Sequence, residues 1–187
     1  MRLRFLWSNI FNKKMNKQSF LLLFLFGVSL VNSQSVKINS LKINEKTTFF
    51  IDFDKLKKAN KIDSITPIPE LMDMSIADSL VFIGNTYFDY YKKTNSCILG
   101  SIIFDNKVTS ISLNSYTFDK NTSIESVKKL FPKNCAKALP INIYGDTKKY
   151  LSCSINLISD RGKKLEYKLL FFFFKNKITR IDLWEPS

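Results

Sequence analysis

The chain has 187 residues, 45% of them apolar, so it can bury one proper core and form one or two small domains. Its formal net charge is +13, and it contains no histidine and only five glycines. These counts exclude histidine-based catalytic triads and the usual zinc ligands, and they leave no glycine-rich loop to cradle a phosphate. Ordinary loop acids explain carboxylate pairs such as Asp52 with Asp54. The sequence therefore predicts no catalytic residue, no metal site and no cofactor.

The first 33 residues have the pattern of a secretory signal peptide. Basic residues without any acid precede an apolar run of 11 residues, Leu21 to Val31, and small side chains follow at Val31 and Ser33. The run is shorter than the about 20 residues that a membrane-spanning helix needs. We expect cleavage near Ser33 and an exported protein, periplasmic or secreted, with Met15 as a second possible start. The alternative is an uncleaved membrane anchor.

After residue 33 the chain holds 24 basic and 16 acidic residues, and only Arg161 and Arg180 are arginines. Arginine is the usual reader of phosphates and base edges, so specific nucleic-acid recognition is not expected. The predicted partner is another protein. No further apolar run is long enough to span a bilayer.

Alternating apolar residues predict strands over much of residues 34–187. The expected strands are 36–43, 80–83, 86–91, 98–104, 107–113, 150–158, 165–174 and 177–184. Two short helices are expected between them. Asp52 can cap a helix over 53–59, and Thr122 with Glu125 forms a capping-box pattern for a helix that ends at Pro132. Residues 62–74, with two prolines, read as a loop.

Two segments of the chain are near-copies of each other, 70 positions apart. Phe104-Asp-Asn-Lys-Val-Thr-Ser-Ile-Ser-Leu113 matches Phe174-Lys-Asn-Lys-Ile-Thr-Arg-Ile-Asp-Leu183, and a fainter copy lies at 38–43. Such a period indicates one structural unit used twice. We therefore predict an α+β fold, residues 34–187 forming a single domain of two tandem repeats (about 38–113 and 108–184). Its antiparallel sheet would carry the short helices on one face, and the apolar strand 167–174 would be covered on both faces.

The helix-capping segment 122–132 and the repeated strand motif together resemble tandem helix/β-meander modules. The β-lactamase-inhibitor-protein type and the related outer-membrane assembly lipoprotein module are built in this way. The chain departs from them in having one short helix per unit and no lipidated cysteine. The resemblance implies a non-catalytic binding surface and leaves the partner unspecified.

Three cysteines follow the apolar leader, at Cys97, Cys135 and Cys153. Exported proteins tend to oxidise their thiols, and an odd number leaves one cysteine unpaired. We favour a Cys135–Cys153 disulfide, because both residues belong to the second unit. A Cys97–Cys135 pair and three free thiols remain open.

The best candidate for a binding surface is the aromatic strand at 86–91. Tyr87, Asp89 and Tyr91 share one face of this strand, while Phe88, Tyr90 and Lys92 share the other. The predicted binding residues are Tyr87, Phe88, Tyr90, Tyr91, Lys92 and Trp184. The favoured function is an exported, non-catalytic protein-binding or inhibitor-type module. The alternatives are a structural component of envelope assembly, a hydrolase that uses carboxylates alone, and aromatic rings that only cap the sheet edge.

Overall fold

The computed structural model describes residues 35–69, 75–143 and 145–185. The predicted signal peptide, with its cleavage point after Ser33, lies outside the described residues, as does most of the second half of the loop expected at 62–74. Gln34–Ser187 forms one compact unit, and all that follows concerns this unit. No helix among the described residues is both long and apolar enough to cross a bilayer.

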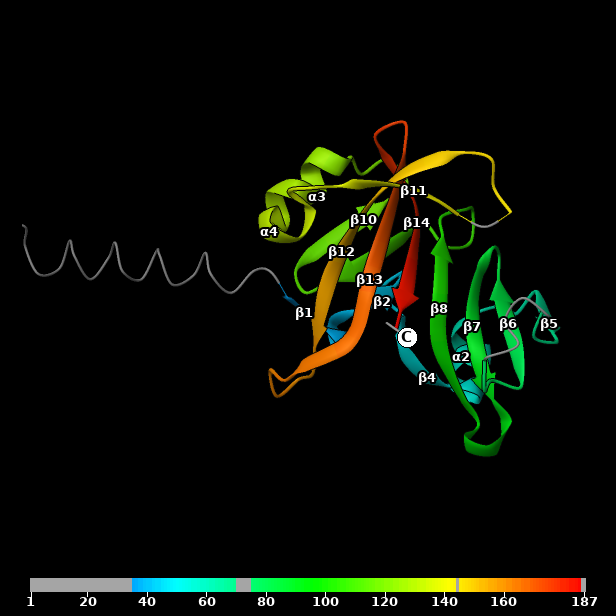
Figure 1. Cartoon of the computed structure of the whole chain (residues 1–187). Coiled ribbons are helices and arrows are strands. Elements are labelled where there is room, and N and C mark those ends of the chain that lie inside the picture. Colours follow the sequence, from blue (N-terminus) through cyan, green and yellow to red (C-terminus); the bar gives the residue numbers. More distant parts are fainter. Residues whose placement is uncertain (1–34, 70–74, 144, 186–187) are drawn as a thin grey trace, which may run out of the picture. The chain divides into compact units, whose positions relative to one another are not determined.

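Ten strands form one large, almost wholly antiparallel sheet (Figure 1). Its spatial order is β1 (Ser35–Lys37), β12 (Lys149–Ile158), β13 (Lys164–Phe174), β14 (Lys177–Trp184), β8 (Ser96–Ile103), β7 (Thr86–Tyr91), β6 (Ser79–Ile83) and β5 (Ser64–Thr66). Two short strands extend it: β11 (Leu139–Asn142) pairs with β12, and β4 (Phe50–Asp52) pairs with β8. Among the described strands, β1 and β12 form the one parallel pair. The meanders β5–β8 and β11–β14 thus meet where β8 pairs with β14.

A smaller sheet and the helices cover one face of the large sheet. The small sheet has the order β10 (Tyr116–Asp119), β9 (Ser110–Leu113), β2 (Lys42–Ile43), β3 (Thr47–Thr48). Phe118 on β10 lies 5.7 Å from Phe171 on β13, ring centre to ring centre, so apolar side chains of the two sheets form one core. On the same face, Phe53 of helix α2 (Phe53–Ala59) packs at 4.6 Å on Tyr90. This arrangement confirms an α+β fold with short helices on one face of an antiparallel sheet.

The helix boundaries follow from local capping, with one correction to the sequence prediction. Asp52 caps α2 by accepting hydrogen bonds from the backbone N–H groups of Asp54 and Lys55. The second helix, α3 (Ile124–Leu130), is capped by Ser123 and not by Thr122. Thr122 instead donates its hydroxyl to Asp119 in the preceding turn, so the expected capping box does not form.

The helix predicted to stop at Pro132 does so, since α3 ends at Leu130, but the loop expected directly after it begins with another helix. Proline is well tolerated in a first helical turn, and here it begins a further short helix, α4 (Pro132–Cys135). The loop expected over 62–74 also contains a strand, β5, which pairs with β6. In the same way, the strand expected at 36–43 is divided by a 3₁₀ turn, η1 (Ile38–Ser40), into β1 and β2.

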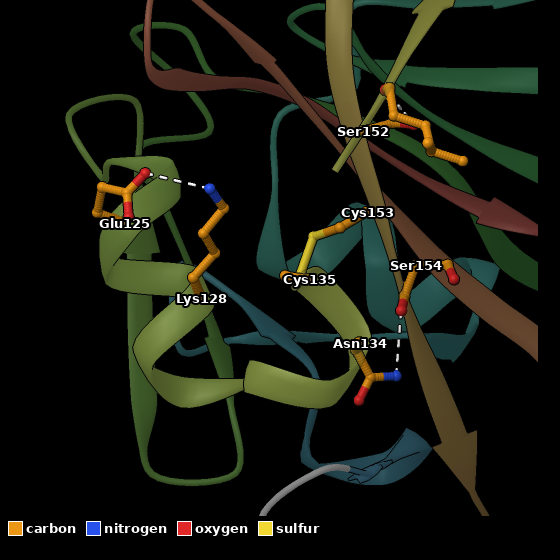
Figure 2. Close-up of a disulfide and its surroundings, with 8 residues drawn as sticks. Glu125, Lys128, Asn134, Cys135, Ser152, Cys153 and Ser154 are labelled. Atoms are coloured by element: carbon orange, nitrogen blue, oxygen red, sulfur yellow. Dashed lines mark hydrogen bonds and ion pairs between the residues drawn. A yellow bond between two sulfur atoms is a disulfide. The ribbon is translucent and has the colours of Figure 1, made fainter. Parts of the chain in front are cut away.

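A disulfide ties α4 to the large sheet. Cys135 of α4 and Cys153 of β12 are bonded, as the sequence favoured, and Cys97 is free and buried (Figure 2). Beside the disulfide, the Asn134 amide donates to the Ser154 carbonyl at 3.1 Å. Two contacts, one covalent, therefore fix α4 on the inner side of β12.

The two near-copies occupy different surroundings. In 174–183 the turn joins β13 to β14 within the large sheet. In 104–113 the Asp105 carboxylate accepts from the N–H groups of Lys107 and Val108, and the chain then leaves for β9 in the small sheet. Residues 107–109, expected to be extended, are not in a strand. Two segments of similar sequence therefore form different connections: one joins neighbouring strands of the large sheet, and the other leads from the large sheet to the small one.

Candidate functional site

The face of the large sheet turned away from the helices, here called the open face, carries the candidate site. Residues paired directly across neighbouring strands point to the same face. One row of this face runs across five strand pairings, through Phe82, Tyr87, Ser101, Asp182, Leu170 and Ser154. The next row contains Ile103, Arg180, Phe172 and Ser152.

The structure separates the predicted binding residues into two groups, as their alternation along the strand indicates. Tyr87 and Tyr91 lie on the open face and are half-buried. Phe88 is fully buried in the core, and Tyr90 packs against α2 on the inner face. Phe88 is therefore unavailable to a partner, and Tyr90, although only partly buried, lies on the face that the helices cover.

The other two predicted residues lie at element ends. Lys92 begins a 3₁₀ turn, η3 (Lys92–Thr94), and is exposed. Trp184 ends β14 with 41% of its surface exposed, and the Lys168 ammonium lies 5.3 Å from its ring centre. The pairing of Trp184 with Lys168 places both on the open face, one row from Asp182.

Tyr87 lies flat against the sheet because the neighbouring strand offers a glycine. A side chain on Gly100 would come within 2.2 Å of the Tyr87 ring. The register between β7 and β8 shifts at this point, so Gly100 forms a bulge beneath the ring. Burial, with the nearby carboxylates of Asp89 and Asp182, raises the pKa of the Tyr87 phenol to about 12. The ring is therefore held neutral and in place.

Asp89 lies on the same face of β7, between Tyr87 and Tyr91. Its Oδ1 is buried and is the one such side-chain atom, among the described residues, without a hydrogen-bond partner. Burial raises the pKa of this carboxyl to about 6. An unsatisfied buried acceptor costs free energy, so Asp89 is a group for which a ligand or partner could supply the missing donor.

A charged cluster at the junction of the two meanders is the feature that the sequence prediction missed. The Asp182 Oδ1 accepts from the Arg180 Nε at 2.6 Å and from the buried Ser101 hydroxyl at 2.7 Å. A bulge in β14 at Thr179 sets this register, and the Thr179 hydroxyl donates to the Phe172 carbonyl. The signal in the sequence was the rarity of arginine after residue 33.

Cations lie over the aromatic rings of the second meander's open face. Besides Lys168 on Trp184, both Lys148 and Lys175 lie within 6 Å of the Phe174 ring centre, and the Arg180 guanidinium carbon is 6.0 Å from that of Phe172. Phe172 is itself buried by its neighbours on this face, Tyr150 among them. Strand 167–174 was expected to be covered on both faces. On the open face, Phe172 is covered by side chains of the large sheet itself and not by a further layer.

An open hollow of about 310 Å³ lies beside Arg180. Its walls include Ile103, Tyr150 and Thr179, and Asp146 closes one side. The Tyr150 hydroxyl donates to the Asp146 carboxylate, which also accepts from the Lys148 backbone N–H. These bonds hold the pKa of Asp146 below its ordinary value, so this carboxylate is ionised and occupied.

Within the described ranges, no group of three or more acidic or cysteine side chains is arranged to hold a metal ion. Comparison of the chain with protein families, with curated proteins and with solved structures gives no match. The function must therefore be argued from the open face itself.

Proposed function

We propose that this protein is an exported, non-catalytic module that binds another protein with the open face of its large sheet. One observation carries the proposal. Tyr87, Tyr91 and Trp184 each place a partly accessible ring on a face that neither the helices nor the small sheet occupy. Tyrosine and tryptophan are enriched at recognition hot spots, because they bury a large area while keeping a polar group.

The rigidity of this face supports a recognition role. Tyr87 is set over the Gly100 bulge, and Arg180 is oriented by Asp182 and Ser101. Side chains that are already fixed lose little conformational entropy when a partner binds, so more of the contact energy appears as affinity.

A duplicated architecture is part of the proposal. The segments β2–β3, α2 and β5–β8 correspond in order to β9–β10, α3 and β11–β14. In both, the first helical N–H bonds the carbonyl of a left-handed Asn just before the last strand: Phe53 to Asn95 at 2.9 Å, and Ile124 to Asn176 at 3.2 Å. These matched contacts support two copies of one hairpin–helix–meander unit, with boundaries near 42–103 and 110–184.

This layout also supports the resemblance to tandem helix/β-meander modules of the β-lactamase-inhibitor-protein type. The resemblance implies a non-catalytic binding surface, and the open face proposed here is a candidate for it. Export after cleavage near Ser33 completes the proposal and rests on the pattern of residues 1–33. A role in envelope assembly would use the same face with a membrane-associated partner.

Affinity purification of the tagged protein from its native host, followed by binding measurements with the recovered partner, tests this function. Tyr87→Ala, Tyr91→Ala and Trp184→Ala are made separately. At least one should weaken binding by about 2 kcal/mol or more with an unchanged melting temperature. If all three bind as tightly as the wild type, the open face is not the interface. Thr117→Ala, on the exposed part of the small sheet, is the matched control.

A further inference from the structure

Arg180 differs from every other basic side chain of the open face in how it is held. Its Nε is fixed on Asp182, whose oxygen is fixed in turn by Ser101. The described part of the chain gives its two terminal nitrogens no hydrogen-bond partner. An arginine anchored through Nε presents those two N–H₂ groups end-on, a geometry that fits the two oxygens of a carboxylate.

The surroundings of Arg180 give such a carboxylate a place. The hollow beside it is walled by Ile103, Tyr150 and Thr179. The nearby Asp146 is neutralised in part by Tyr150 and by Lys148, whose ammonium is 3.9 Å from its carboxylate. The acids next to the hollow are therefore already paired and do not occupy the free donors of Arg180.

Basic residues outnumber acidic ones in the half of the chain that forms this part of the face, although Asp146 itself lines the hollow. Residues 116–185 hold 14 basic and 7 acidic residues, whereas residues 34–115 hold 10 and 9. On the open face of the second meander, Lys148, Lys168 and Lys175 lie over aromatic rings. A partner that crosses this surface meets cations lying over aromatic rings, which favours acidic side chains on that partner.

From this geometry we propose that the open face recognises an acidic segment of a partner protein, one carboxylate of which binds end-on to Arg180 in the hollow. The inference rests on the proposed function and specifies the chemistry of the partner. Aspartate or glutamate side chains would meet Arg180 and the surrounding lysines, and the apolar parts of the segment would pack on Phe174 and Trp184. Electrostatic complementarity of this kind sets specificity and speeds association.

A phage-displayed library of random dodecapeptides, selected in parallel on the wild-type protein and on Arg180→Lys, tests the inference. Lysine keeps the charge and removes the two-nitrogen fork, and thermal unfolding checks that the variant is folded. Arg161→Lys, in the exposed β12–β13 turn, is the matched control. Peptides enriched on the wild type should carry Asp or Glu. They should bind Arg180→Lys about tenfold or more weakly, bind the control equally well, and lose affinity when the acid becomes the amide.

The other outcomes separate this inference from the function on which it rests. The selection could instead enrich neutral peptides that no longer bind when Trp184→Ala is introduced. Such peptides would bind the open face, so they would overturn the acidic partner but still support a protein-binding face. Selection that yields no peptide dependent on Arg180 overturns the inference. So does exclusive binding to phosphatidylglycerol vesicles, which would make the face a reader of lipid phosphate. Peptides that bind away from the open face contradict both.

Discussion

The large sheet contains two four-stranded antiparallel meanders, β5–β8 and β11–β14, and their open faces carry different side chains. In β5–β8 the face is organised around a phenol over a glycine bulge and a carboxyl whose pKa is raised to about 6 by burial. In β11–β14 it is organised around cations on aromatic rings and an arginine tied to Asp182. Beneath the sheet, the second meander alone has a disulfide, and the first has the free Cys97. The two meanders therefore have the same strand arrangement, and the side chains on their open faces give each one a different chemistry.

The disulfide should give the largest difference between the halves. Removing it as Cys135→Ser with Cys153→Ser should lower the free energy of unfolding by about 3 kcal/mol, because the bond closes a loop of 18 residues. Urea denaturation measures this. Cys97→Ala, a truncation in the first meander, should cost about 1 kcal/mol through lost packing. Equal costs for the two changes would contradict the asymmetry.

The bulge at Gly100 should tolerate no side chain while Tyr87 is present. Gly100→Ala brings a methyl group against the ring, which must leave its position at a cost of about 1–3 kcal/mol. The pKa of Tyr87 should then fall from about 12 toward its ordinary value, as ultraviolet titration of the phenol would show. In a Tyr87→Ala background the same change should cost clearly less. An equal cost in both backgrounds would show that the ring is not the obstacle.

Asp89 should make the stability of the protein fall with rising pH. Its pKa in the folded state, about 6, lies above the ordinary value of about 3.9, so the folded state binds the proton more tightly. The stability that the protonated Asp89 carboxyl contributes is fully present below about pH 4 and is lost as pH rises through about 6. Asp89→Asn should remove this slope and stabilise the protein at pH 8 by about 1–2 kcal/mol, reduced for partial solvent access. Denaturation from pH 4 to pH 8 tests the sign, and a slope that persists in Asp89→Asn would show that another group causes it.

The helix caps should give the smallest effect and the same one in both halves. Asp52 caps α2 and Ser123 caps α3, each through backbone N–H groups of the first turn. Asp52→Ala and Ser123→Ala should each cost about 1 kcal/mol. Thr122→Ala should not show the loss of a helix cap, although it removes the turn bond to Asp119. A large cost in one half only would argue against a shared unit.

Local patterns allowed much of the fold to be predicted. Alternation located the long strands, Asp52 located α2, and the split of Tyr87 and Tyr91 from Phe88 and Tyr90 followed from period-two geometry. The pairing of Cys135 with Cys153 could be favoured because both belong to the predicted second unit, where one follows the helix and the other lies in the next long strand. The other features depend on residues within a few positions of one another.

The sequence predictions failed mainly where contacts between residues far apart in the chain determine the structure. The small sheet exists because β2 pairs with β9, about 70 positions away, and no local signal shows this. The near-copies 104–113 and 174–183 diverge because the Asp105 carboxylate holds a turn for which Lys175 offers no equivalent. Bulges at Gly100 and Thr179 shift the register, so strict alternation fails past them. Arg180 was overlooked as a site because Ser101, which helps to hold its partner Asp182, lies 81 positions from that carboxylate.

Site-specific photo-crosslinking in the native host tests the central claim, that the open face is the docking surface, most directly. A benzoylphenylalanine is placed at Tyr91 or Phe174 on the open face and, as controls, at Lys129 on α3 or Thr117 on the small sheet. The account predicts one discrete crosslinked protein from both open-face positions and none from the controls. Crosslinks from the control positions alone would place the interface on the helical side and contradict the account.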